Sequence, residues 1–96
     1  MHALISYDVS TKNAAGRRRL RRIAQACSDY GKRVQFSVFE CSLSHADWVR
    51  LRYRLLHEID PAEDSLRLYL LCDRDIERVE HLGVRAPLSL EGPLVL

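Results

Sequence analysis

Long apolar stretches are missing from this sequence. The longest run, residues 68–72, spans five residues, whereas a membrane-spanning helix needs about 20. The first eight residues contain no basic region, and their apolar centre is too short for a signal peptide. We therefore expect a cytoplasmic protein that has no membrane partner.

The common catalytic and metal-binding motifs are missing as well. The three cysteines, an odd number with no C-x-x-C spacing, argue against a disulfide framework and against a zinc site. The chain has no H-E-x-x-H motif, no Walker loop and no glycine-rich dinucleotide turn. Its four histidines are scattered, so we assign none of them to catalysis.

The chain does have enough apolar residues for one small core. It is 96 residues long and 47% hydrophobic, which suits a single domain with a modest interior. Sequence patterns predict the element order β-α-β-α-β-β. The elements are a strand over 1–8, a loop over 9–16, a helix from 17 that stops at a left-handed Gly31, an extended segment over 33–43, a helix over 45–59 capped by Ser44, a strand over 65–72 and a hairpin arm over 76–82.

This order predicts one α+β domain over residues 1–96, with a ferredoxin-like antiparallel sheet and both helices on one face. Such a fold needs a hairpin between its helices. Residues 33–43 contain neither glycine nor proline for a tight turn, so their division into one strand or two stays open. The chain ends on apolar Leu94, Val95 and Leu96, and we expect the extension over 84–96 to pack as a strand on a second copy.

Positive charge is concentrated in one part of the chain. Residues 12–33 contain eight basic residues and one acidic residue, a balance of +7, whereas the whole chain carries +2. Helix N-termini repel cations by roughly 0.3–1 kcal/mol each. Phosphate binding therefore explains the cluster better than a solvated helix face does, although both interpretations stay open. The cluster consists of Arg17, Arg18, Arg19, Arg21 and Arg22.

Asp8 is singular because it ends the first strand directly after an apolar run. A carboxylate in such a place either forms a turn or a helix cap, or it binds a hard cation such as Mg²⁺. A single carboxylate is a small ligand set for the metal ion of a nuclease. A two-fold axis beside Asp8 would bring a second one from another copy, so the metal interpretation also predicts a homodimer.

Three segments together resemble the CRISPR-associated protein two family. They are residues 4–10 (LISYDVS), 30–41 (YGKRVQFSVFEC) and 64–71 (DSLRLYLL), and the likeness extends to 91–96 (EGPLVL). The resemblance implies a ferredoxin-like homodimeric endonuclease that needs Mg²⁺ (or Mn²⁺) and acts on RNA or double-stranded DNA. It further implies that Asp8 is the catalytic metal ligand at the dimer axis. Tyr7, Phe39 and the nucleic-acid contact Arg33 are then expected in or near the same cleft.

The resemblance also implies a place in CRISPR spacer acquisition, which serves antiviral defence. There the dimer is a DNA-spanning subunit bound to the CRISPR integrase, and its own cleavage is dispensable. Two functions therefore stay open, a metal-dependent endonuclease and a non-catalytic structural scaffold that binds DNA. The sequence does not decide between RNA and DNA, and it does not say which arginines touch phosphate.

Overall fold

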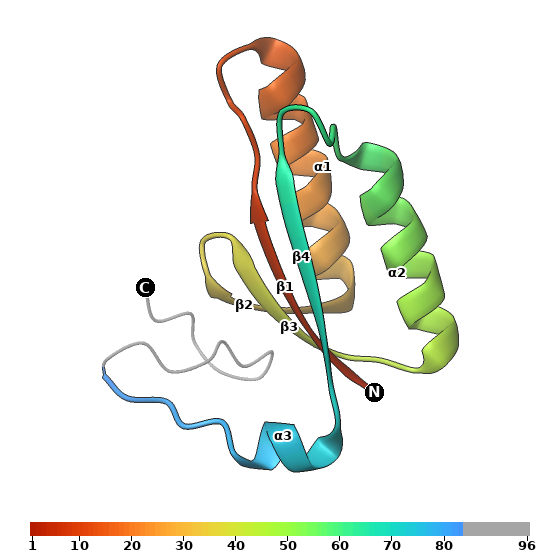
Figure 1. Cartoon of the computed structure of the whole chain (residues 1–96), viewed down its shortest axis with the longest axis vertical. Helices are drawn as coiled ribbons and strands as arrows, with labels where there is room; N and C mark the ends of the chain where they lie inside the picture. Colours follow the sequence, from red (N-terminus) through yellow and green to blue (C-terminus); the bar gives the residue numbers. More distant parts are fainter. Residues whose placement is uncertain (84–96) are drawn as a thin grey trace.

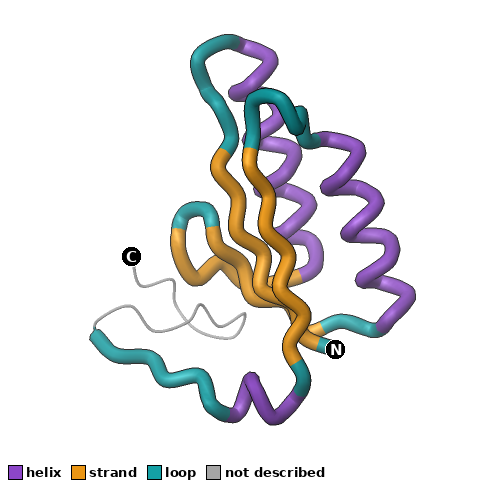
Figure 2. Tube along the Cα trace, viewed as in Figure 1, coloured by secondary structure: helices purple, strands orange, loops and turns teal. Residues whose placement is uncertain are grey.

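Four antiparallel strands form a single sheet in the computed structural model, which describes residues 1–83. The strands lie in the order β2-β3-β1-β4, and helices α1 and α2 cover one face of the sheet (Figures 1 and 2). This arrangement confirms the predicted ferredoxin-like α+β fold. The predicted C-terminal extension lies outside the described residues. The elements are β1 (His2–Asp8), α1 (Ala14–Tyr30), β2 (Gly31–Gln35), β3 (Val38–Ser42), α2 (His45–Glu58), β4 (Ser65–Leu71) and α3 (Asp73–Glu77).

The core lies between the sheet and the two helices. Alternate residues of β1 point into it, while α1 and α2 each contribute a stripe at helical spacing. Burial raises the pKa of Cys27 to about 12 and that of Cys41 to about 11, so both thiols stay neutral and pack as small apolar groups. Within the described part of the chain, no helix is long and apolar enough to cross a membrane. The largest fully buried side chains are Phe39, Ile5, Ile23, Leu51, Leu55 and Cys27.

The segment over 33–43, whose division the sequence left open, contains the end of β2, a turn and β3. The turn at Phe36 and Ser37 needs no glycine because β1 holds it. The backbone N–H of Tyr7 donates to the carbonyl of Ser37 (3.1 Å), and the Tyr7 hydroxyl donates to the carbonyl of Phe36 (3.3 Å). A bulge between Arg33 and Gln35 shifts the register just before the turn.

The ends of α1 differ from the prediction. The helix starts at Ala14 because Asn13 caps it, its side-chain oxygen accepting a hydrogen bond from the N–H of Gly16 (2.8 Å). The predicted left-handed stop at Gly31 is wrong, since Gly31 is extended (φ −155°) and begins β2 directly. Glycine is needed there for another reason. A Cβ atom would lie 2.6 Å from the Glu40 carbonyl oxygen and would collide with the Cys41 sulfur.

The predicted hairpin arm over 76–82 is wrong. Its first two residues belong to α3, and residues 78–83 contain no strand. The cap explains the helix, because the Asp75 carboxylate accepts hydrogen bonds from the N–H (3.0 Å) and the thiol (3.1 Å) of Cys72. The predicted cap of α2 is confirmed, since the Ser44 hydroxyl accepts a hydrogen bond from the N–H of Asp47 (3.1 Å).

Candidate functional site

Asp8 is the last residue of β1, and its side chain is exposed. Side chains alternate along a strand, so Asp8 lies on the sheet face opposite the helices, together with Leu4 and Ser6. Asp8 pairs with Ser65 at the start of β4. On the other side of β1, the turn between β2 and β3 is held by Tyr7. The carboxylate therefore stands at an open corner of the sheet, between β4 and the hairpin.

Asp8 is the carboxylate that this corner offers to a metal ion. Among residues 1–83, no group of three or more histidine, cysteine, aspartate or glutamate side chains is placed to hold a metal ion. Mg²⁺ keeps several of its waters and binds through one or two carboxylates. An exposed Asp8 fits such a loosely held ion, and it fits better when a second copy adds its own Asp8.

Arg67 lies on the same face as Asp8, and sequence reasoning missed it. It stands opposite Ser6 in the pairing of β1 with β4, which makes it a diagonal neighbour of Asp8. Its guanidinium donates a hydrogen bond to the Tyr69 hydroxyl (3.1 Å). A phosphate at Asp8 would therefore have a cation within reach. The alternation of residues 65–72 indicated that Arg67 lies opposite the apolar side of this strand. It did not indicate that β4 pairs with β1.

Tyr7, Phe39 and Arg33 come together, but on the other face of the sheet. The Tyr7 and Phe39 rings stack with their centroids 6.3 Å apart, and the Arg33 guanidinium carbon lies 5.0 Å from the centre of the Phe39 ring. Burial raises the pKa of Tyr7, and a hydrogen bond with Arg33 offsets this only in part. The neutral Tyr7 hydroxyl donates its hydrogen bond to the carbonyl of Phe36 in the turn. Tyr7 therefore contacts Phe36 and not the Asp8 carboxylate.

Asp64, directly before β4, ties together the segments around the corner. Its side chain is fully enclosed, and its carboxylate accepts hydrogen bonds from the N–H groups of Ser10 (3.0 Å) and Asp60 (3.0 Å) and from Arg19 (2.8 and 3.2 Å). Burial alone would raise the pKa of Asp64, but these hydrogen bonds outweigh it, and the pKa lies below its usual value. Asp64 therefore fixes the loop that follows Asp8, and it has no oxygen free for a metal.

The arginines of α1 divide into two groups. Arg19 faces inward to Asp64, and Arg22 lies 3.7 Å from Glu58 on α2. The side chains of Arg17, Arg18 and Arg21 are exposed, and no acidic group of the described chain lies within ion-pair distance of them. These three stand on the helix layer, whereas Asp8 and Arg67 lie on the open face. Three of the five predicted arginines thus lie on the other side of the sheet from Asp8, and Arg19 is bound to Asp64 beside the corner.

The sheet order and the helix layer define this chain as a small ferredoxin-like α+β protein. A family model described as CRISPR associated protein Cas2 matches residues 1–79, and the chain belongs to that family.

Several relatives match this chain in sequence over almost its whole length. The chain is 57% identical to the CRISPR-associated endoribonuclease Cas2 of Chlorobaculum tepidum over 96 residues, with both chains fully covered. It is 44% identical to the CRISPR-associated endonuclease Cas2 of Halalkalibacterium halodurans, with 99% of each chain covered. The crystal structure of Streptococcus pyogenes Cas2 at pH 6.5 superposes with a TM-score of 0.74 at 52% identity, covering 86% of this chain and all of that one.

Proposed function

We propose that this chain is a metal-dependent endonuclease that works as a homodimer, with Asp8 of each copy holding Mg²⁺ or Mn²⁺. The observation that carries the proposal is the placement of Asp8, an exposed carboxylate on the open sheet face with Arg67 diagonal to it. Relatives that match this chain over nearly its full length bear the names endoribonuclease and endonuclease.

Each part of the corner has a role in this chemistry. When held at Asp8, Mg²⁺ would supply an activated water and positive charge for the departing oxygen. Asp8 supplies the charge that holds the ion, and Arg67 contacts a non-bridging oxygen of the phosphodiester. Asp64 and Arg19 keep the loop after Asp8 in place through the hydrogen bond to Ser10. The substrate is the backbone of RNA or of double-stranded DNA, bound without regard to sequence.

A second function is supported by a separate observation. The exposed Arg17, Arg18 and Arg21 lie on the helix layer, away from the open face that carries Asp8. A surface of this kind suits a duplex backbone held at a distance from any cleavage site. We therefore propose that the dimer also serves as a structural DNA-binding subunit for the CRISPR integrase in spacer acquisition. As a scaffold, it would need neither Asp8 nor a metal.

One experiment separates the two functions. Purified dimer is titrated with Mg²⁺ or Mn²⁺ after treatment with a chelator, and cleavage and binding of RNA and duplex DNA are measured on the same samples. We expect cleavage to rise with metal from a zero baseline while duplex binding stays nearly constant. Cleavage that survives full chelation would reject the metal-dependent mechanism. Duplex binding without cleavage at every metal concentration would support the scaffold function and reject the nuclease function.

The arginine face predicts a steep salt dependence. Replacing Arg17, Arg18 and Arg21 with alanine should lower the slope of log affinity against log salt by up to about 0.9 for each lost duplex phosphate contact. Arg19→Ala is the matched control, because that guanidinium is bound to Asp64. We expect it to reduce stability without changing the slope. Equal slopes for the triple variant and the unmodified chain would show that this face is only solvated.

A further inference from the structure

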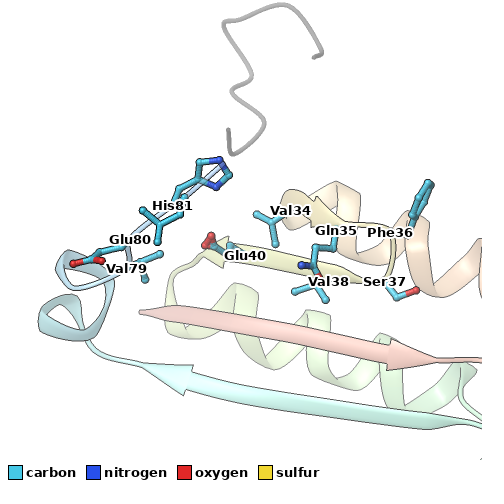
Figure 3. Close-up of a pocket in the computed structure, with 10 residues that line it drawn as sticks. Val34, Gln35, Phe36, Ser37, Val38, Glu40, Val79, Glu80 and His81 are labelled. Atoms are coloured by element: carbon cyan, nitrogen blue, oxygen red, sulfur yellow. The ribbon is translucent and has the colours of Figure 1, made fainter. Parts of the chain in front are cut away.

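Phe36 is an aromatic side chain with no obvious structural purpose. Its side chain is 79% exposed, more than that of Tyr53 or Tyr69, the other exposed aromatic residues of the described chain. In Figure 3 the ring projects from the turn between β2 and β3, away from the strands. Single exposed apolar residues are common, so the case for a function depends on where Phe36 stands and how firmly it is held.

The turn that carries Phe36 is fixed to the strand that carries Asp8. Both polar groups that Tyr7 can donate, its N–H and its hydroxyl, bind the carbonyls of Ser37 and Phe36. Tyr7 itself is 4% exposed and stacked on the buried Phe39. The bulge before Gln35 re-aims the strand where it enters the turn. A rigid anchor therefore presents an exposed ring beside the residue that precedes Asp8.

The residues that line the groove next to the turn do not cover the Phe36 ring. Phe36 lies at its border, and the facing wall comes from residues 79–82 (Figure 3). Of that wall, Leu82 is 85% and Val79 55% exposed, so neither is packed. Asp8 does not line this groove. Within residues 1–83, the ring is therefore open to a ligand that lies across the corner of the sheet.

We propose that Phe36 is a stacking site for one unpaired base of a nucleic-acid strand whose phosphate lies at Asp8. An exposed phenyl ring stacks on the face of any base, which makes the contact tolerant of sequence. Bases of a duplex are already stacked on their neighbours, so the ring has an open face to bind only where a nucleotide is unpaired. Exposed Lys32, which pairs with Glu40 on the open face of the sheet, supplies a cation for the strand's backbone.

This assignment rests on the proposed nuclease function, because Asp8 locates the phosphate. It adds that the site selects single-stranded over double-stranded nucleic acid. The stacking contact itself needs no metal and no cleavage. It can therefore be measured in the presence of a chelator, where a failure of the Asp8 mechanism does not affect the result.

The test compares Phe36→Ala, Phe36→Leu and Phe36→Trp in the full chain, with Tyr53→Ala as a matched loss of an exposed aromatic residue on α2. The probes are a short fluorescent single strand, as RNA and as DNA, and the same sequence as a duplex. We expect Phe36→Ala and Phe36→Leu to weaken single-strand binding at least about fivefold, equivalent to about 1 kcal/mol. We expect Phe36→Trp to keep or improve binding, and duplex binding to stay unchanged.

Four results would overturn the proposal. The first is unchanged single-strand binding by Phe36→Ala, and the second is an equal loss for single strand and duplex. The third is a change of oligomeric state in sedimentation, which would make Phe36 a contact between protein chains. The fourth is full single-strand binding by Phe36→Leu, which would show that the position requires bulk rather than an aromatic face.

Discussion

Replacing Asp8 with asparagine should reduce metal-dependent cleavage by more than about 100-fold while leaving nucleic-acid binding within a few-fold. Changes to groups that merely orient metal ligands cost 10- to 100-fold in affinity or activity, and loss of the ligand's charge should cost more. The amide keeps the size of the side chain, and Asp8 is exposed, so the fold should not change. Cleavage of a labelled strand and binding in chelator are the two measurements.

Asp73→Asn is the matched control, since Asp73 is an exposed aspartate at the start of α3, where it contacts His2 (2.9 Å). We expect it to cleave as the unmodified chain does. If Asp8→Asn cleaves at an unaltered rate, Asp8 is not the ligand. If Asp73→Asn loses as much activity as Asp8→Asn, the loss comes from removing a negative surface charge anywhere on the chain, and not from the position of Asp8 at the corner of the sheet.

Mixed dimers test whether the ion needs both copies. When unmodified and Asp8→Asn chains are mixed and allowed to exchange, a site that requires two carboxylates leaves activity only in the unmodified dimers. Activity should then fall as the square of the unmodified fraction. A linear fall would show that each chain works on its own, which the lone carboxylate of one protomer argues against.

Strands β1 and β4 at the corner were readable from the sequence, and the turn between β2 and β3 was not. β4 was predicted from the alternation of Leu66, Leu68 and Leu70 with Arg67 and Tyr69, and β1 from its apolar centre over residues 3–5, and both patterns are local. The turn at Phe36 and Ser37 has neither glycine nor proline, and its stability comes from Tyr7, about 30 positions away in the chain. Pattern reading sees local preferences only, so it left the division of this segment open.

The residues predicted for the site lie on both faces of the sheet. That Tyr7 and Asp8 face opposite sides follows from their adjacency in a strand, yet the family resemblance grouped them in one cleft. Arg19 looked like its four neighbours because its acidic partner, Asp64, lies 45 residues further along the chain. Nothing local distinguishes an arginine that binds phosphate from one that binds a buried carboxylate.

Asp64→Ala should lower the free energy of unfolding by about 2–3 kcal/mol, because it leaves the N–H groups of Ser10 and Asp60 and the Arg19 guanidinium without their acceptor. Denaturant unfolding at a fixed protein concentration measures this, since the proposed dimer would make apparent stability depend on concentration. Asp64→Asn should cost less, because an amide oxygen still accepts. The loop after Asp8 should loosen in both variants.

The pH dependence distinguishes the charge from the packing. The folded pKa of Asp64 lies below its usual value because the donated hydrogen bonds outweigh burial. Its contribution to stability is therefore complete above the unfolded pKa of about 3.9 and is lost as pH falls through the lower folded pKa. The stability gap between the unmodified chain and Asp64→Asn should be constant near neutral pH and should shrink below about pH 4.

Glu63→Ala is the control for this last prediction. Glu63 joins the same two loops through Lys12 (2.9 Å), but both side chains are substantially exposed. Such a pair contributes about 0–1 kcal/mol and is screened by salt, so we expect a small loss at low salt and almost none at high salt. The Asp64 effect should persist at high salt, because its carboxylate is enclosed. Equal effects for Glu63→Ala and Asp64→Ala would mean that the enclosed carboxylate stabilises the corner no more than an exposed ion pair does, and that it does not organise the loop after Asp8.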